Sequence, residues 1–332
     1  MKKRVKLPED ENPHKNQAIE WWYFNGFLEG KNKYAYMTCF FKANRKKLNL
    51  RFLELPTKDV YFSHSLLYNL TTKRIIKDVL PIVIPSKDIF SRKQLFINYF
   101  FPLRTNFINY EILRQKDGLR VKNKFLDLNM KSMKKPLLEG GTGFLDLGQK
   151  TTYYYTYSNL KTEGFIGSEF VKGKSWHDKQ WSTKGFMKDY WLWFSLQMPN
   201  NTEIVCFDYK GKKLATISYP NNKQKTVVPE FFPIGKPWKS KKSGNEYVLE
   251  WKIKIGEFEI KTKPIIKDCE VNFGTINYWE GPITIHVNGI KSHGFMESLT
   301  KQKEFSFRES AEKEIKEILK NFNFKKLMEL AG

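Results

Sequence analysis

Short runs of aromatic and β-branched residues, each ended by Gly, Asn, Pro or Lys, recur along most of this 332-residue chain. Runs of this length and composition are typical of pleated sheets joined by tight turns, so they predict antiparallel all-β structure. The clearest runs cover residues 19–28, 34–42, 190–198, 203–209, 247–255 and 282–287. At roughly 150 residues per domain, the length suits two domains with a core each. We expect two consecutive β-domains of barrel or sandwich type, over residues 1–168 and 169–305.

Helical periodicity is clear only near the C-terminus. From Ser310 to Leu330, apolar residues recur at steps of three and four among Glu and Lys, which is typical of an amphipathic helix. We expect this helix, within residues 306–332, to pack on the outside of a sheet. Docking on a membrane or on a partner protein is the alternative.

The charge of the chain is strongly positive, with 58 Lys and Arg against 35 Asp and Glu, a net charge of +23. Only nine of these basic residues are Arg, and the lysines are spread over the whole chain. Sites that read bases favour the forked guanidinium, so the composition argues against nucleic acid as a partner. Weak peripheral contact with an anionic membrane stays open. No stretch approaches the roughly 20 apolar residues of a membrane-spanning helix.

The N-terminus and the cysteines point to the cytoplasm. The basic start, Met1-Lys2-Lys3-Arg4, is not followed by the apolar run of a secretory signal. Cys39, Cys206 and Cys269 are odd in number and far apart, without a CxxC pair. They are therefore expected to be reduced thiols, with no disulfide framework and no zinc site.

Two hairpins can be analysed by strand parity, because side chains alternate across a strand. If the turn in Pro199-Asn200-Asn201-Thr202 centres on its two asparagines, Trp193 pairs with Asp208. One face then holds the apolar residues Leu192, Phe194, Leu196, Val205 and Phe207. The other face holds Trp191, Trp193, Ser195, Gln197, Ile204, Cys206 and Asp208. Aromatic area with a few polar groups is typical of a pocket wall.

A structural role for Asp208 is the alternative, in which it only accepts a hydrogen bond from an indole or a backbone amide. A register shift of one residue would move this carboxylate to the core face. The first hairpin, with its turn near Lys31-Asn32, is expected to place Trp22 and Cys39 on one face and Tyr23 and Thr38 on the other.

Five sequence words occur in an order that is specific in combination. They are Glu20-Trp21-Trp22-Tyr23-Phe24-Asn25-Gly26, Phe62-Ser63-His64, Ser175-Trp176-His177-Asp178-Lys179-Gln180-Trp181, Trp193-Phe194-Ser195-Leu196-Gln197 and Tyr278-Trp279-Glu280-Gly281. With these words the chain resembles the lipocalin-like AttH / hydroxyneurosporene synthase family, which includes the carotenoid 1,2-hydratases. The resemblance covers residues 14–297, most of the chain.

The resemblance implies two lipocalin-like (calycin-type) β-domains and a hydrophobic ligand held in the barrel region or at the domain junction. It also implies chemistry on isoprenoids or related apolar molecules without a metal or a cofactor. In the hydratases, an acidic residue on the strand after the WFSLQ-like strand is thought to protonate a terminal alkene. The matching position here is Asp208.

Three positions depart from the family pattern. Where members commonly have Trp-x-Asp-His-Glu-Trp, this chain has Lys179 in place of the His and Gln180 in place of the Glu. The tyrosine expected two residues before the acid is Cys206. The fold is therefore expected to transfer better than the reaction.

Hydration of an unactivated alkene needs a proton donor, a group that stabilises the carbocation, and an ordered water. A carboxylic acid in an apolar cavity can stay protonated, and aromatic faces can stabilise the cation. We expect Asp208 to be the acid and His177 to position water or relay a proton. The expected substrate-binding residues are Trp21, Tyr23, His64, Trp176, Trp181, Trp191, Trp193, Gln197 and Cys206.

Other functions stay open at this level. A carrier of isoprenoids or lipids would use the same aromatic cavity without reacting, and a pericyclase-type enzyme would mainly fold a polyene. A metal hydrolase is disfavoured because the chain has no HExxH motif, and a serine hydrolase because it has no GxSxG motif. Glu20 and Glu280, beside their tryptophans, are expected to be structural and to accept hydrogen bonds from backbone or indole N–H groups.

Overall fold

The structure, a computed structural model, describes residues 3–48, 58–102, 107–186, 189–273 and 276–301. Strands dominate these residues, and the helices among them are three short 3₁₀ segments, η1 (Glu9–Glu11), η2 (Lys87–Phe90) and η3 (Glu139–Gly141). The predicted antiparallel all-β class is therefore confirmed. The helix predicted within residues 306–332 lies outside the described residues. Across the described ranges, no helix has the length and apolar character needed to cross a bilayer.

The chain forms two compact units, and neither is one continuous stretch of sequence. The first, called the barrel unit here, contains Val5–Met133 and Leu160–Gly185. The other, called the second unit, contains Lys134–Asn159 and Phe186–Phe305. A single cut at residue 168 does not describe this division. The reason is that the strand after residue 168 pairs along its whole length with the first strand of the chain.

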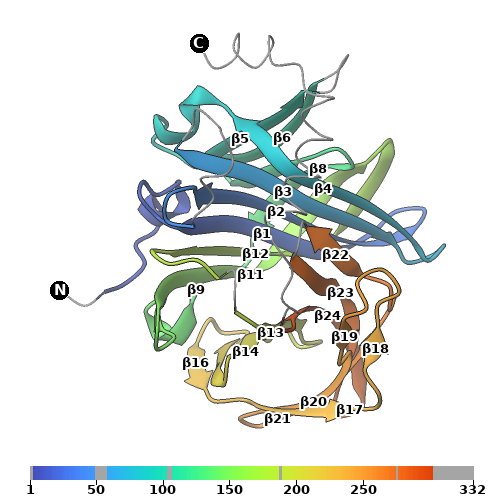
Figure 1. Cartoon of the computed structure of the whole chain (residues 1–332). Coiled ribbons are helices and arrows are strands. Elements are labelled where there is room, and N and C mark those ends of the chain that lie inside the picture. Colours follow the sequence, from blue (N-terminus) through green and yellow to red (C-terminus); the bar gives the residue numbers. More distant parts are fainter. Residues whose placement is uncertain (1–2, 49–57, 103–106, 187–188, 274–275, 302–332) are drawn as a thin grey trace. The chain divides into compact units, whose positions relative to one another are not determined.

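Ten strands of the barrel unit, within the described part of the chain, form a closed antiparallel barrel (Figure 1). They are β1 (Ile19–Glu29), β2 (Lys33–Asn44), β3 (Asp59–Asn69), β4 (Arg74–Pro85), β5 (Phe96–Pro102), β6 (Phe107–Gln115), β7 (Gly118–Lys122), β8 (Leu126–Ser132), β11 (Thr151–Ile166) and β12 (Glu169–Ser182). The order is β11-β12-β1 and then β2 to β8. The barrel closes because Leu160 of β11 pairs with Ser132 of β8, and Ile166 with Leu126.

A polar contact across the barrel identifies its interior face. Asn123, after β7, donates hydrogen bonds from Nδ2 to Thr38 Oγ1 (3.3 Å) and Ser65 Oγ (3.2 Å). Side chains of β2 with the parity of Thr38 therefore point inward, and so do their partners on β1 and β12. Gly26 shares this face, where a Cβ atom would lie only 2.6 Å from Ser175 Oγ, so only glycine fits.

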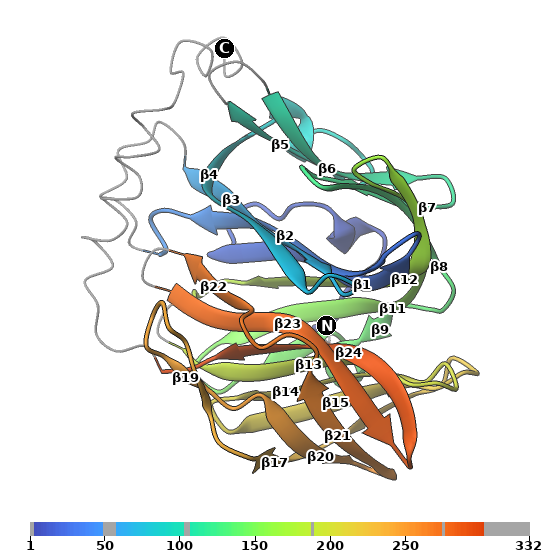
Figure 2. The same ribbon diagram turned by 90° about the vertical axis from the view of Figure 1, so that its right-hand side faces the viewer.

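The second unit is built on a curled antiparallel sheet (Figure 2). Its strands run β16-β15-β14-β13-β24-β23-β21-β20-β17, and β22 pairs with β23. Their bounds are β13 (Trp191–Gln197), β14 (Glu203–Tyr209), β15 (Lys212–Ser218), β16 (Gln224–Val227), β17 (Glu230–Ile234), β20 (Glu250–Ile255), β21 (Phe258–Pro264), β22 (Glu270–Phe273), β23 (Ile276–Val287) and β24 (Ile290–Leu299). The short strands β9 (Leu137–Leu138), β10 (Phe144–Asp146), β18 (Trp238–Lys239) and β19 (Glu246–Tyr247) complete the set. One face of the sheet forms the core, where the Phe194 and Phe231 rings stack with centroids 5.9 Å apart.

The predicted register of the β13–β14 hairpin is wrong by one residue. Met198 N donates to Thr202 O (2.8 Å), and Asn201 adopts a left-handed φ of 57°. The loop is therefore three residues long, a length that asparagine permits because it tolerates this conformation. Trp193 consequently pairs with Phe207, and Asp208 pairs with Leu192.

The faces of the hairpin change with this register. Cys206, Ile204 and Asp208 lie on the core side with Phe194, whereas Val205 and Phe207 join the tryptophans. The β1–β2 hairpin differs in the same way, because Glu29 pairs with Lys33 across a three-residue loop. Cys39 is thus opposite Tyr23, and Thr38 is opposite Phe24.

Candidate functional site

The predicted site residues of the barrel unit fall on two opposite faces of one sheet. His177 and Trp181 are on the interior face, while Trp21, Tyr23, His64 and Trp176 have the opposite parity. The structure therefore brings Tyr23 and His64 to one face through their common neighbour Cys39. On that face Trp176 donates its indole N–H to Asp178 Oδ1 at 2.7 Å.

Both predicted histidines of the barrel unit are buried. The His177 ring stacks on Phe24 with centroids 4.1 Å apart, and its Nδ1 lies 3.0 Å from the carbonyl oxygen of Tyr23. The His64 ring contacts those of Phe41 and Phe62, at 4.9 Å and 5.7 Å between centroids. Burial lowers the pKa of each histidine to about 3, so both rings are neutral near pH 7.

The two buried histidines are expected to make the folded state less stable in acid. An unfolded histidine has a pKa near 6.5, whereas both folded rings resist protonation down to about pH 3. The unfolded state therefore binds more protons in this window, and each histidine removes about 1.4 kcal/mol of stability for each pH unit of acidification. We expect the Tm to fall steadily below pH 6.5, with a shallower slope for His177→Phe, which keeps the stack on Phe24. An unchanged slope in that variant would contradict this assignment.

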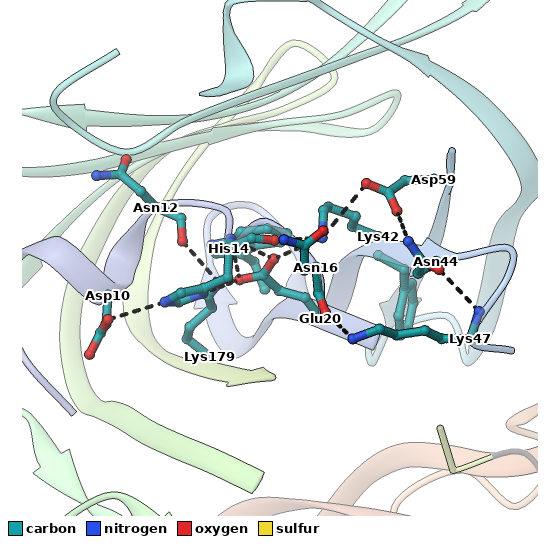
Figure 3. Close-up of polar contacts among 12 residues, drawn as sticks. Asp10, Asn12, His14, Asn16, Glu20, Lys42, Asn44, Lys47, Asp59 and Lys179 are labelled. Carbon is teal, nitrogen blue, oxygen red and sulfur yellow. Dashed lines mark hydrogen bonds and ion pairs between the residues drawn. The ribbon is translucent and has the colours of Figure 1, made fainter. Parts of the chain in front are cut away.

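A buried cluster of charges lies where the N-terminal segment meets β1, β2 and β12 (Figure 3). Its centre is the Glu20 carboxylate, which is 0% exposed. Glu20 Oε1 forms an ion pair with Lys179 Nζ, and Oε2 lies 3.6 Å from Lys42 Nζ. His14 adds its backbone N–H at 2.9 Å and its Nδ1 at 2.6 Å. One carboxylate thus lies between two buried ammonium groups, and Asp59 Oδ2 approaches the second, Lys42 Nζ, at 4.0 Å.

Aromatic rings enclose the ammonium of Lys179. Its Nζ lies 3.7 Å from the ring centroid of Trp22 and 5.3 Å from that of Trp181, a cation–π arrangement. Burial lowers the pKa of Lys179 to about 8 despite the attraction of Glu20. Burial alone would raise the pKa of Glu20, but the charge of Lys179 and the hydrogen bond from His14 bring it to about 2. Both groups are therefore charged near pH 7.

A second acidic cluster lies on the sheet face of Trp191 and Trp193 in the second unit. Glu297 of β24 stands directly across from Trp193 of β13 on one side and Glu280 of β23 on the other. The Trp191 indole N–H donates to Glu297 Oε1, and the Trp193 indole N–H donates to the Tyr154 hydroxyl at 2.9 Å. Glu280 is 0% exposed, whereas Glu297 and Trp191 are half-buried. We call Glu280 and Glu297 the carboxyl pair.

The carboxyl pair is suited to hold a proton. Burial raises the pKa of Glu297 above its usual range, and hydrogen bonds with Glu280 and Trp191 offset this only in part. Two carboxyl groups can hydrogen-bond to each other only if one of them carries a proton. Glu297 is not among the site residues predicted from the sequence, although a lone Glu in the run Phe295-Met296-Glu297-Ser298-Leu299 was an available signal.

The structure does not bring Asp208 to the tryptophans. Its Oδ1 accepts a hydrogen bond from Gly211 N (2.7 Å), and its Oδ2 lies 3.9 Å from Lys213 Nζ. Asp208 thus caps the β14–β15 turn, and its side chain is 27% exposed. Cys206 is buried on the core side, where burial raises the pKa of its thiol. Gln197 keeps the parity of Trp193 and donates to Ser158 O at 3.3 Å.

Comparisons with known proteins agree with this fold. The family model described as AttH-like matches residues 1–300. A crystal structure of a protein from Nitrosomonas europaea, provisionally assigned as AttH, is similar with a TM-score of 0.70 and 20% identity, over 90% of this chain and 98% of that one. Kievitone hydratase from Nectria haematococca is similar with a TM-score of 0.68 and 19% identity, over 90% and 94% of the two chains.

A curated relative matches a shorter stretch. Dehydratase asqC from Emericella nidulans is 29% identical over 90 residues, which is 25% of this chain. The match spans about a quarter of the length of that relative.

Proposed function

The chain belongs to the AttH-like family, and from this premise we propose that it is a hydro-lyase, an enzyme that adds water to a hydrophobic small molecule or removes it. Two similar proteins, one named a hydratase and the other a dehydratase, support a reaction of this class. The finer proposal is acid-catalysed hydration of a C=C bond in an isoprenoid or carotenoid-like substrate.

The observation that carries this proposal is the half-buried Glu297, which accepts the Trp191 indole N–H, lies across from Trp193 and is paired with Glu280; burial raises its pKa. The charged cluster around Glu20 is less suited to meet a substrate, because Glu20 and Lys179 are both 0% exposed. A useful general acid must be reachable and protonated near the working pH. Within the two clusters, Glu297 is the carboxyl group that is partly exposed and whose pKa burial raises.

The proposed reaction begins with transfer of the Glu297 proton to one alkene carbon. The π electrons form the new C–H bond and leave a tertiary carbocation on the neighbouring carbon, which the faces of Trp191 and Trp193 stabilise. A water oxygen then bonds to the cation, and its surplus proton returns to the carboxylate of the pair. The product is a tertiary alcohol, and dehydration is the same sequence in reverse.

The partners of Glu297 have distinct roles in this proposal. Glu280 lies deeper, and its hydrogen bond lowers the pKa of Glu297 in part, so it would stabilise the Glu297 carboxylate that remains after proton transfer. The Trp191 indole N–H fixes Oε1 of Glu297 and so holds the carboxyl group beside the indole rings. Trp191 is therefore a positioning residue as well as an aromatic wall.

The function is tested by incubating the full chain with a panel of isoprenoid alkenes and tertiary alcohols in heavy-oxygen water. Mass spectrometry should show gain or loss of one water and incorporation of the heavy oxygen into the alcohol. A compound that binds but comes back unlabelled would indicate a carrier. A product of unchanged mass with new ring bonds would indicate a pericyclase-type cyclase. Either result would overturn the hydro-lyase proposal.

Asp208→Asn tests the acid predicted from the sequence against Glu297. Because Asp208 caps a turn on the other side of the sheet, we expect turnover within about twofold of the unmodified chain. The measurement is kcat and KM for the substrate found above, with Tm as the control for folding. A loss of a hundredfold or more at unchanged Tm would return Asp208 to the site and remove Glu297 from it.

A further inference from the structure

Exposed apolar side chains gather along the edge strand of the second sheet. β17 ends the strand order, so one side of it has no partner strand in the described sheet (Figure 2). Phe232 and Ile234 lie on one face of β17 and are 40% and 37% exposed, and Val228, two residues before the strand, is 74% exposed. Phe231 points to the other side, where its ring stacks on Phe194. One face of β17 thus packs in the core through Phe231. The other face exposes the apolar side chains of Phe232 and Ile234 to solvent.

Lysines outnumber carboxylates around these apolar side chains, although Glu230 shares their face and Glu250 pairs with Ile234. Residues 223–254 contain eight Lys against three Glu. Lys254 Nζ lies 5.5 Å from the Phe232 ring centroid. Lys252 of β20 is the strand partner of Phe232 of β17. Lys236, two residues after the strand, is exposed. Val228, Phe232, Ile234, Lys236 and Lys254 are called the edge patch below.

We propose that the edge patch docks on an anionic lipid surface. Apolar side chains that insert at the headgroup boundary, combined with ammonium groups that meet lipid phosphates and carboxylates, are the pair of signals that peripheral binding requires. The net charge of +23 attracts the whole chain to such a surface. This inference goes beyond the hydro-lyase proposal and does not depend on the carboxyl pair.

A second copy of the chain fits this edge less well than lipid does. Pairing of edge strands between copies needs a row of backbone N–H donors, and Pro229 and Pro233 lack them. Repulsion between two strongly basic copies also opposes that contact. The charge and the prolines therefore both favour lipid as the occupant.

The barrel unit supplies a matched control. Phe165 and Phe170 are 48% and 47% exposed, and their rings meet edge to face at 5.5 Å. Their neighbourhood includes the carboxylates of Glu163 and Asp127, which share a surface depression with them. This second aromatic pair is equally apolar, and Lys172 Nζ lies 5.4 Å from the Phe170 ring centroid. Its depression is lined by two carboxylates, so it should bind anionic lipid less well than the more basic edge patch.

The test is co-sedimentation of the full chain with phosphatidylcholine vesicles, with and without phosphatidylserine. We expect binding only when phosphatidylserine is present, and release at high salt. Phe232→Ser/Ile234→Ser should lower the bound fraction roughly tenfold, and Phe165→Ser/Phe170→Ser should leave it unchanged. Lys236→Glu/Lys254→Glu changes two exposed charges and should also lower the bound fraction. It provides the test if Phe232→Ser/Ile234→Ser fails to fold.

Three results would overturn the proposal. They are no binding to phosphatidylserine vesicles, equal binding by the edge-patch variants and the unmodified chain, and equal loss in the Phe165 and Phe170 control. Light scattering of the free protein tests whether a second copy of the chain occupies the patch instead. A dimer in the unmodified chain that becomes a monomer in Phe232→Ser/Ile234→Ser would identify the patch as a contact between copies.

Discussion

Glu297→Gln is expected to lower kcat by roughly a thousandfold while substrate binding stays within about threefold. The amide can still accept the hydrogen bond from Trp191, so the geometry of the pocket wall is kept. It cannot supply a proton, and the carbocation therefore does not form. Turnover measured by mass spectrometry and binding measured by quenching of tryptophan fluorescence separate these two effects.

The pH profile gives a second readout of the same group. Because burial raises the pKa of Glu297, the unmodified chain should lose activity as the pH rises through that pKa and the carboxyl group ionises. Glu257→Gln, at an exposed carboxylate bonded to the Tyr219 hydroxyl, is the control and should leave rate and profile unchanged. Retained turnover in Glu297→Gln would show that the proton comes from another group.

Glu280→Gln distinguishes a catalytic pair from a structural contact. If Glu280 shares the proton, this variant should change the pH at which activity is lost, while the Tm changes little. A large fall in Tm with an unchanged pH profile would restore the structural role predicted from the sequence.

Glu20→Gln is expected to lower the free energy of unfolding by about 3–5 kcal/mol. Without its charge, the ammonium groups of Lys179 and Lys42 would stay buried near one another with no carboxylate between them. The pKa of Glu20, lowered to about 2, also means that its contribution to stability is present above pH 4.5 and is lost toward pH 2. Urea unfolding at pH 7 measures the change.

Two further variants show whether charge is the cause. Glu29→Gln removes an exposed carboxylate from the same strand, 3.7 Å from Lys33, and should cost less than about 0.5 kcal/mol. Glu20→Gln/Lys179→Met removes both members of the buried ion pair and should recover at least half of the lost stability, because one uncompensated charge is gone. A double variant no more stable than Glu20→Gln would contradict this account.

Local patterns were sufficient to predict the fold class but not the hairpin registers. Runs such as 19–28 and 203–209 are strands in the structure, because their parity and composition suit a sheet wherever it lies. Register depends on loop length, and both misjudged loops contain three residues instead of the expected even number. One residue of difference moved Asp208 and Cys206 to the opposite face.

The carboxyl pair could not be assembled from the sequence for a different reason. Trp193 and Glu297 are about a hundred residues apart and meet because β13 pairs with β24, a choice made by the whole sheet. The Glu20 cluster is similar, since Lys179 reaches β1 only through the pairing of β12 with β1. Motif words identified the tryptophans and Glu280, but only the sheet topology supplied their partners.

The closure of the barrel by β11 and β12 also sets the timing of folding during translation. At roughly 5–20 residues per second, the ribosome exposes β1 to β8 seconds before residues 160–182 emerge. Until then β1 and β8 are two open sheet edges on a growing chain, free to pair with the wrong neighbour. A gene truncated at codon 168 would encode a barrel that cannot close, because β12 would be missing between β11 and β1.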